Sequence, residues 1–224
     1  MAPTLPKLKL THFDARMRGE STRLALHVGN VPFEDERVSY KTVHDPGETW
    51  LTMKKTMPFR QMPVMTINGT TQISQSNGIL RYAGTLGGLY PAADPLKAAL
   101  VDQVVLHIDD MNMVIFPSII ERDNNKKTLL RKEIAEKKFP EMLSDLDKVL
   151  EKHSAGKWSV GDTLTVADLC VYVLIGLIKS GIWDGIPANM ADKYTCVHRV
   201  YEAVRTHPKV PSGSLRIRSS ATLI

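Results

Sequence analysis

The sequence predicts two unlike parts: an α/β domain with the element order βαβ-ββα, followed by an all-α domain. Three observations lead to this prediction. Strand-like and helix-like runs alternate over the first 90 residues, the turn Asn68-Gly69 separates two strand-like runs, and a breaker cluster at 91–95 precedes an almost wholly helical stretch. We therefore expect one domain over residues 1–90 and a second over 91–224.

The first domain opens with a βαβ unit. Residues 7–13 alternate apolar and polar side chains, as a half-buried strand does, and 33–38 is a second short extended run. Between them, residues 22–28 have the apolar spacing of a helix.

A hairpin and a helix complete this domain. The runs 62–67 and 70–73 flank Asn68-Gly69, and Asn-Gly between two such runs is the strongest short-range hairpin signal. A helical pattern resumes at 76–82, so the unit closes as βαβ-ββα.

The second domain begins with a long helix that has one buried face. Gln103, His107 and Asp110 fall on another face of this helix. Further helices are expected over 127–138 and from Pro140 to about residue 152. The apolar residues that recur at helical spacing are Val101, Val104, Val105, Ile108, Met111 and Ile115.

A sharp helix start is predicted at Thr165. Asp168 stands three positions later, where its carboxylate can reach back to the cap amide, and Leu164 and Leu169 occupy the positions of a hydrophobic staple. The run that follows is apolar nearly all round, which is typical of the centre of a helical bundle.

Composition and charge exclude several classes of protein. With 43% hydrophobic and 24% charged residues, the chain is neither disordered nor fibrous, and its longest nearly uncharged run, 169–178, is too short to span a membrane. No secretory signal is evident, so we expect a cytoplasmic protein without a membrane partner. Cys170 and Cys196 lie in separate apolar segments, so we expect packing residues instead of a disulfide or a zinc site.

The net charge of +5 raises the question of an acidic partner. Positive residues such as those of 126–132 are mixed with negative ones and have no interleaved aromatic residues, so we expect no nucleic-acid partner. The excess charge favours small anionic ligands.

Four motifs together resemble those of the cytosolic glutathione transferase family, over about residues 7–210. Within the family the chain is most similar to the tyrosine-type classes, sigma or pi being nearest. The resemblance implies a thioredoxin-like first domain that binds glutathione as co-substrate, and a homodimer. The motifs lie at residues 10–16, 58–64, 75–82 and 161–168.

The resemblance assigns residues to the parts of glutathione. The Met62–Pro63 bond is expected to be cis, with the Met62 backbone pairing with the cysteinyl unit as an added strand, although a simple strand-start proline is the plainer interpretation. Gln75 and Ser76 would bind the γ-glutamyl carboxylate at a helix N-terminus, although Ser76 alone could be only a helix cap. Trp50 and Lys54 match positions that hold the glycyl end, and Gln61 is also expected to bind glutathione.

Two charged residues complete the implied glutathione site. Arg18 matches an arginine that steadies the site, and Asp110 matches a carboxylate that reaches the ligand's amine across the dimer interface. Asp109 and Asp110 with His107 could also suggest a metal cluster, but adjacent residues on a helix face apart. We therefore predict no required metal.

The sequence departs from the family pattern at the catalytic position. The family's tyrosine, whose hydroxyl donates to the glutathione thiolate, falls at His12, and Met17 and Arg60 replace glycines. We expect His12 to stabilise the thiolate less well than tyrosine, while a solvent-facing His12 with no role is the competing interpretation.

The function implied is conjugation of glutathione to small hydrophobic electrophiles. We expect the electrophile pocket to include Met17, Met111, Val114 and Phe116, although core packing accounts equally well for any one of them. One rival is a non-catalytic ligand carrier or structural member of the family. The other is a glutathione-dependent isomerase or peroxidase.

Overall fold

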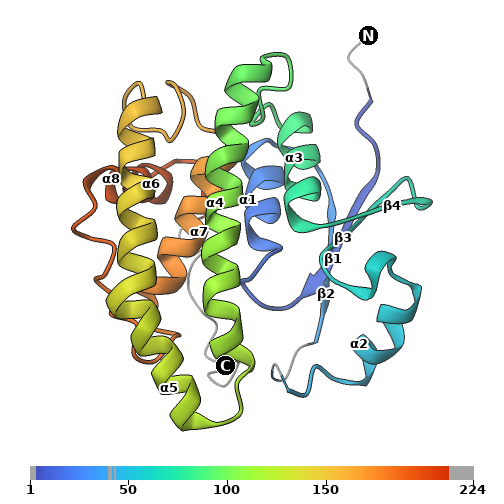
Figure 1. The fold of residues 1–224 in the computed structure, drawn as a ribbon. Helices are drawn as coiled ribbons and strands as arrows, with labels where there is room; N and C mark the ends of the chain where they lie inside the picture. The colour runs from blue at the N-terminus through green and yellow to red at the C-terminus, as the bar shows by residue number, and fades with distance from the viewer. Residues whose placement is uncertain (1–3, 40–41, 43, 212–224) are drawn as a thin grey trace. The chain divides into compact units, whose positions relative to one another are not determined.

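The computed structural model describes residues 4–39, 42 and 44–211. The described residues divide into two compact units between Tyr90 and Pro91. The first unit holds every strand of the described chain, and the second is helical (Figure 1).

A four-stranded sheet forms the centre of the first unit. Its strand order is β2-β1-β3-β4, with β1 and β2 parallel and the other neighbours antiparallel. This confirms the predicted order βαβ-ββα. The bounds are β1 (Leu8–Phe13), α1 (Glu20–Val28), β2 (Glu34–Val38), β3 (Val64–Ile67), β4 (Thr71–Ser74) and α3 (Ser76–Leu86).

The predicted hairpin turn is present. Asn68 and Gly69 have φ values of 51° and 74°, the left-handed pair that a type I′ turn requires. The Asn68 side chain also accepts a hydrogen bond from the Lys7 backbone N–H at 2.9 Å. The turn therefore fixes the register of β3 against β4 and is tied back to β1.

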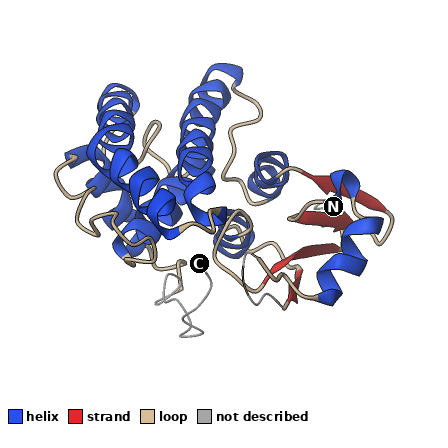
Figure 2. Cartoon of the chain, turned by 60° about the horizontal axis from the view of Figure 1, so that its bottom comes forward, coloured by secondary structure: helices blue, strands red, loops and turns tan. Residues whose placement is uncertain are grey.

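Strand β1 presents two different faces. Leu8, Leu10 and His12 alternate along one face and are buried, whereas Lys9 and Phe13 on the opposite face are half-buried. Figure 2 shows α1 and α3 on one side of the sheet and the short helices of 48–60 on the other. These are α2 (Glu48–Met53) and two 3-10 turns (Lys54–Thr56 and Pro58–Arg60), none of which the sequence analysis predicted.

Helices α1 and α3 end in close contact because both carry a glycine there. A Cβ added to Gly29 would lie 2.5 Å from the Gly87 Cα, a distance that backbone atoms cannot accommodate. The two glycines therefore set how closely the helices approach at this end.

In the described part of the second unit, five α-helices and one π-helical turn pack together. Val101, Val104, Val105, Ile108, Met111 and Ile115 are all buried, which confirms the predicted face of the first helix. The π turn Ile134–Lys138 joins two helices where separate ones were expected. Pro140, which has no N–H to donate, stands two residues after its end. The helices are α4 (Pro95–Ile120), α5 (Asn124–Glu133), α6 (Phe139–His153), α7 (Val166–Lys179) and α8 (Thr195–Arg205).

Helix α7 is the core of this unit, in contact with α4 and α8. It begins with the predicted capping box of Thr165 and Asp168, and nearly all of its residues are buried. Asp168 also accepts a hydrogen bond from the Ser159 N–H, so this carboxylate fixes both the helix start and the preceding loop. Cys170 and Cys196 are both buried, as expected of packing residues. Within the described ranges, no helix has the length and apolar character needed to cross a membrane.

Candidate functional site

Ten of the predicted site residues lie in the first unit. His12 is on β1, Met17 and Arg18 are in the loop before α1, Trp50 is on α2 and Lys54 begins the 3-10 turn that follows α2. The others lie ahead of β3 and at the start of α3. The remaining four, Asp110, Met111, Val114 and Phe116, are on α4 of the second unit.

The sheet register brings two predicted motifs to one place. Val64 pairs with Ser74 across the β3–β4 ladder, so Pro63 and Gln75, which flank this pair, lie at the same end of the sheet. The Met62–Pro63 bond is cis, as predicted, and Pro63 is buried while Met62 is half-buried. Gln61 is exposed and extended, with φ −135° and ψ 156°.

Arg18 and Ser76 contact each other at this end. The Arg18 Nη1 donates a hydrogen bond to the Ser76 Oγ at 3.3 Å, and Ser76 is the first residue of α3. Gln75 precedes it with φ 74°, so the α3 N-terminus begins from a left-handed residue. A guanidinium, a hydroxyl and the backbone N–H groups of a helix N-terminus form a combination that binds carboxylates.

Trp50, on α2, and Lys54, in the 3-10 turn after it, are half-buried. None of the six residues of α2 is buried. The Trp50 ring meets the Phe13 ring edge-on, with centroids 5.3 Å apart and an interplanar angle of 73°. This contact joins α2 to the end of β1.

His12 is buried, with 3% of its surface exposed, so the competing interpretation of a solvent-facing side chain is wrong. Its ring lies on the same face of β1 as Leu8 and Leu10 and packs against the α1 N-cap. A Cβ added to Gly19 would be 2.9 Å from the His12 Cγ, which leaves room only for glycine beside this ring. The strand alternation at 8, 10 and 12 was the sequence signal for this burial.

Burial also sets the charge of His12. It lowers the pKa of His12 to about 3, and the nearby Arg23 guanidinium acts in the same direction. The imidazole is therefore neutral at physiological pH. Its Nδ1 is buried and makes no hydrogen bond to any described residue.

A buried ion cluster supports the end of β1, and the sequence analysis missed it. Arg23 pairs with Asp35 at 2.9 Å and with Glu20 at 3.4 Å, and its side chain is 6% exposed. It also donates to the backbone carbonyls of Phe13 and Ala15. Burial raises the pKa of Glu20, while the guanidinium opposes this shift. The available signal was the i, i+3 spacing of Glu20 and Arg23 on a helix.

The predicted α4 residues differ in accessibility. Met111 is 0% exposed and forms part of the helical core, so core packing accounts for it. Val114 is half-buried and Phe116 is 40% exposed. Phe116 lies five positions after Met111, so the two side chains point to different sides of the helix. Asp110 is exposed.

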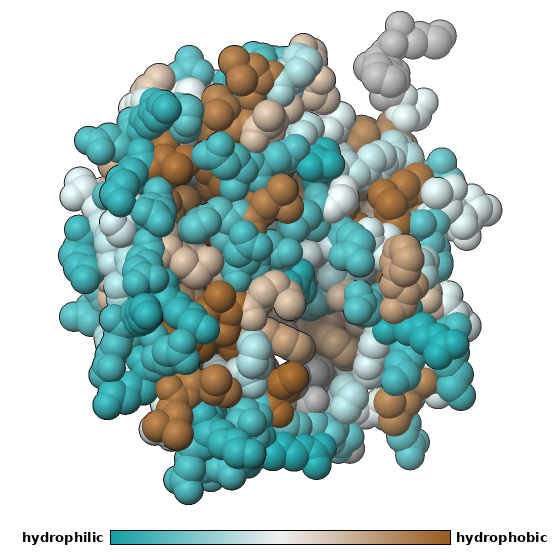
Figure 3. Space-filling model, viewed as in Figure 1, coloured by the Kyte–Doolittle hydropathy of each residue, from teal (hydrophilic) through white to brown (hydrophobic). Residues whose placement is uncertain are grey.

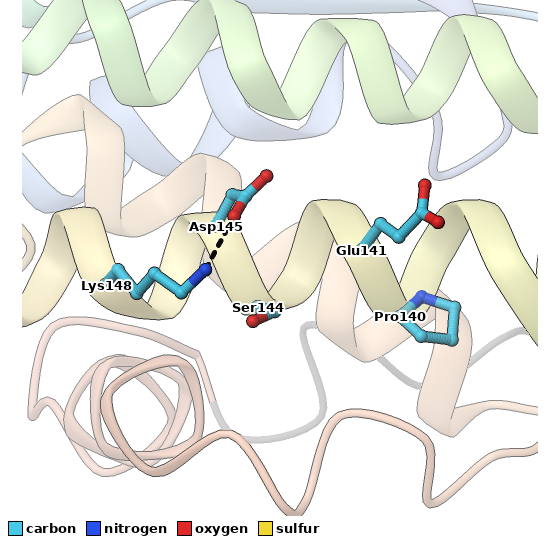
Figure 4. Close-up of a pocket in the computed structure, with 5 residues that line it drawn as sticks. All are labelled: Pro140, Glu141, Ser144, Asp145 and Lys148. Atoms are coloured by element: carbon cyan, nitrogen blue, oxygen red, sulfur yellow. Dashed lines mark hydrogen bonds and ion pairs between the residues drawn. The ribbon is translucent and has the colours of Figure 1, made fainter.

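A hollow of about 350 Å³ lies along α6, lined by Pro140, Glu141, Ser144, Asp145 and Lys148 (Figure 4). Its residues come from one helix face, and Lys148 pairs with Asp145 at 3.0 Å. It contains none of the predicted site residues. Among the described residues, no group of three or more His, Cys, Asp or Glu side chains is placed to hold a metal.

Residues 8–85 match the family described as Glutathione S-transferase, N-terminal domain, and residues 109–212 match Glutathione S-transferase, C-terminal domain. The chain is 32% identical over 206 residues to hematopoietic prostaglandin D synthase of Gallus gallus, and 30% identical over 211 residues to glutathione S-transferase 1 of Ascaris suum. Each alignment covers 92% of this chain and 94% of the relative. The chain therefore belongs to the glutathione S-transferase family.

A solved structure supports the same assignment. The structure of prostaglandin synthase D of Nilaparvata lugens superposes with a TM-score of 0.80 at 25% identity, covering 95% of this chain and 99% of that one. The similar proteins thus include some named as transferases and some named as prostaglandin D synthases.

Proposed function

We propose that this protein conjugates glutathione to small hydrophobic electrophiles. The observation that carries the proposal is the meeting of Arg18, Ser76 and the cis Pro63 at one end of the sheet. A tripeptide with two carboxylates needs anion donors and an extended backbone partner, and this end of the sheet supplies both.

Each part of glutathione has a proposed partner. Ser76, the Gln75–Ser76 backbone and Arg18 would bind the γ-glutamyl carboxylate, and the Met62 backbone would pair with the cysteinyl unit. Trp50 and Lys54 would hold the glycyl end, with Gln61 between the two regions. In this arrangement the thiol is held in place for attack, which is the main source of rate enhancement available.

Thiolate stabilisation is the weak part of this mechanism. A neutral imidazole offers one N–H at most, and the His12 ring is almost wholly buried. We therefore expect slow conjugation, with Arg18 and backbone amides contributing. On α4, Val114 and Phe116 have the accessible apolar surface to contact an electrophile; Met17 is half-buried in the first unit.

Glutathione-dependent isomerisation is the second candidate function. A relative 32% identical over almost the whole chain is named a prostaglandin D synthase. An isomerase regenerates its glutathione in each turnover, so it needs positioning of the thiol but no net consumption. Both functions use the same glutathione site.

We also propose a cytosolic homodimer in which Asp110 reaches the partner's glutathione. Asp110 is exposed on α4, between Leu106 and Met113, which are 49% and 53% exposed. These three residues, at i, i+4 and i+7, share one helix face. Figure 3 shows apolar residues as separate patches among hydrophilic ones on the face in view. Light scattering at micromolar concentration should give the mass of a dimer. A monomer that binds glutathione with full affinity would contradict the proposal that Asp110 completes the partner's site.

Calorimetric titration with glutathione tests the proposal first. The wild-type protein and Ser144→Ala, a change at a half-buried serine on α6, should bind alike, and Ser76→Ala should bind more weakly. A panel of electrophiles, with conjugate and remaining glutathione measured by chromatography, then separates the functions. Formation of a glutathione conjugate would identify a transferase. Turnover of the substrate without loss of glutathione would identify an isomerase, and glutathione binding without any turnover would identify a carrier.

A further inference from the structure

We propose that Phe13 is a positioning residue: it holds Trp50 in place and thereby determines how strongly the site recognises the glycyl end of glutathione. This inference rests on the proposed function, because Trp50 must contact the glycyl end. It concerns a residue that the sequence analysis gave no role in binding.

The backbone at Phe13 is firmly held. The buried Arg23 donates to the Phe13 carbonyl at 3.2 Å and to the Ala15 carbonyl at 3.3 Å. The following N–H, that of Asp14, donates to the Val38 carbonyl at 2.9 Å, and the Asp14 carboxylate pairs with Arg37 at 2.9 Å. The Phe13 ring therefore projects from a fixed point.

Helix α2, in contrast, has little of its own to hold it. It is six residues long, well below the length at which a helix is stable alone, and none of its residues is buried. Its N-cap, Gly47, provides no side-chain hydrogen bond. The orientation of Trp50 must come from a tertiary contact.

The Phe13 ring supplies that contact. Phe13 and Trp50 meet edge-to-face with centroids 5.3 Å apart, which is a favoured aromatic geometry. On its other side, the Phe13 ring lies 5.8 Å from the His12 ring at 64°. The three rings thus extend from the buried strand to α2, and Phe13 is the link between them.

Loss of the Phe13 ring should weaken recognition of one part of glutathione only. Without the Phe13 ring, Trp50 loses its orientation, whereas Arg18 and Ser76 keep their hydrogen bond through other elements. The variant should therefore lose the preference for a glycyl group and keep its affinity for the γ-glutamyl and cysteinyl parts.

The test compares glutathione with γ-glutamylcysteine, which lacks the glycine, by calorimetric titration of the full chain. Phe13→Leu should weaken glutathione binding about three- to tenfold and change γ-glutamylcysteine binding less than about twofold. Phe13→Tyr, which keeps the ring, should restore the preference. Phe33→Leu is the matched control at another half-buried phenylalanine of this unit and should bind both ligands as the wild type does.

A double-mutant cycle completes the test. In a Trp50→Leu background, Phe13→Leu should have no further effect on glutathione affinity, because its effect acts through Trp50. Equal losses for both ligands, or additive losses in the cycle, would overturn the inference while glutathione binding itself stands. A wild-type protein that binds neither ligand would instead remove the proposed function, and this inference with it.

Discussion

The two halves of the proposed glutathione site are built differently. At the γ-glutamyl half, Pro63 and Ser76 are buried, and the β3–β4 register and an Arg18 hydrogen bond hold them together. At the glycyl half, no residue of α2 is buried, and Phe59 and Arg60 have left-handed backbones with φ near 50°.

The contacts of the γ-glutamyl half are therefore formed before the ligand binds, whereas those of the glycyl half are not. A preorganised half loses little entropy on binding and should provide most of the affinity. The glycyl half must be ordered through contacts with the rest of the unit. Its residues should therefore contribute less to glutathione affinity and selectivity than those of the γ-glutamyl half.

Removing Arg23, which supports the end of β1, should have the largest effect on the stability of the first unit. Arg23→Met leaves the Asp35 and Glu20 carboxylates without their partner and the Phe13 and Ala15 carbonyls without a donor, so we expect a loss of about 3 kcal/mol in unfolding free energy. Urea denaturation measures this. Arg37→Met is the control at a guanidinium that is 47% exposed, and it should cost less than about 1 kcal/mol. Equal losses would show that the buried cluster has no special role.

The two halves can be compared directly by affinity. Ser76→Ala should weaken glutathione binding by about 1.5–3 kcal/mol because a charged carboxylate loses a hydroxyl donor. Lys54→Met should cost only about 0.2–1 kcal/mol, since Lys54 is half-buried on a weakly held element. Calorimetric titration of both variants with glutathione measures the two losses of binding free energy. A larger loss for Lys54→Met than for Ser76→Ala would show that the glycyl half contributes more affinity than the γ-glutamyl half.

The neutral His12 makes the stability of the first unit depend on pH. Its pKa is about 3 in the folded protein and near 6.5 when unfolded, so the unfolded chain binds more protons between these values. Stability is full above pH 6.5 and falls as the pH drops toward 3, by about 2 kcal/mol between pH 7 and pH 5. His12→Phe should remove this part of the pH dependence in urea denaturation. The same pH dependence in both proteins would mean that His12 does not titrate in this way.

The smallest effect is expected at the glycyl half. Arg60 has φ 52°, and Arg60→Gly relieves the cost of a left-handed residue, offset in part by greater freedom of the unfolded chain. A stability gain of about 0.5 kcal/mol should appear in denaturation curves. Gly69→Ala, at φ 74°, is the reverse control and should destabilise. A lower unfolding free energy for Arg60→Gly would show that contacts of the arginine side chain stabilise the protein by more than the left-handed backbone destabilises it.

The sequence predicted the fold well wherever the signals were local. The Asn68-Gly69 turn, the Thr165–Asp168 capping box and the buried face of α4 each depend on residues a few positions apart, and all three are confirmed. Helix α2 was missed because six residues with no buried face leave no periodic pattern. The π turn before Pro140 was missed because its backbone spacing cannot be read from side-chain periodicity.

The site was less predictable because it depends on contacts between distant segments. Arg18 and Ser76 were both identified from the family resemblance, but their hydrogen bond joins residues 58 positions apart. The Arg23–Asp35 pair and the Phe13–Trp50 contact likewise require the tertiary structure. For His12, the strand alternation indicated burial, yet its position at the strand end left a solvent-facing interpretation open, and that interpretation is wrong.

His12, neutral and buried, should give little stabilisation to the glutathione thiolate. The most direct measurement is the pKa of bound glutathione, followed by ultraviolet absorbance of the thiolate, in the wild type, His12→Phe and His12→Tyr. We expect His12→Tyr to lower the pKa of the bound thiol by about one unit relative to the wild type, which corresponds to about 1.4 kcal/mol, and to raise the conjugation rate. His12→Phe should leave the thiol pKa close to that of the wild type. A wild-type thiol pKa already as low as that of His12→Tyr, and raised in His12→Phe, would contradict the claim and make His12 itself the thiolate stabiliser.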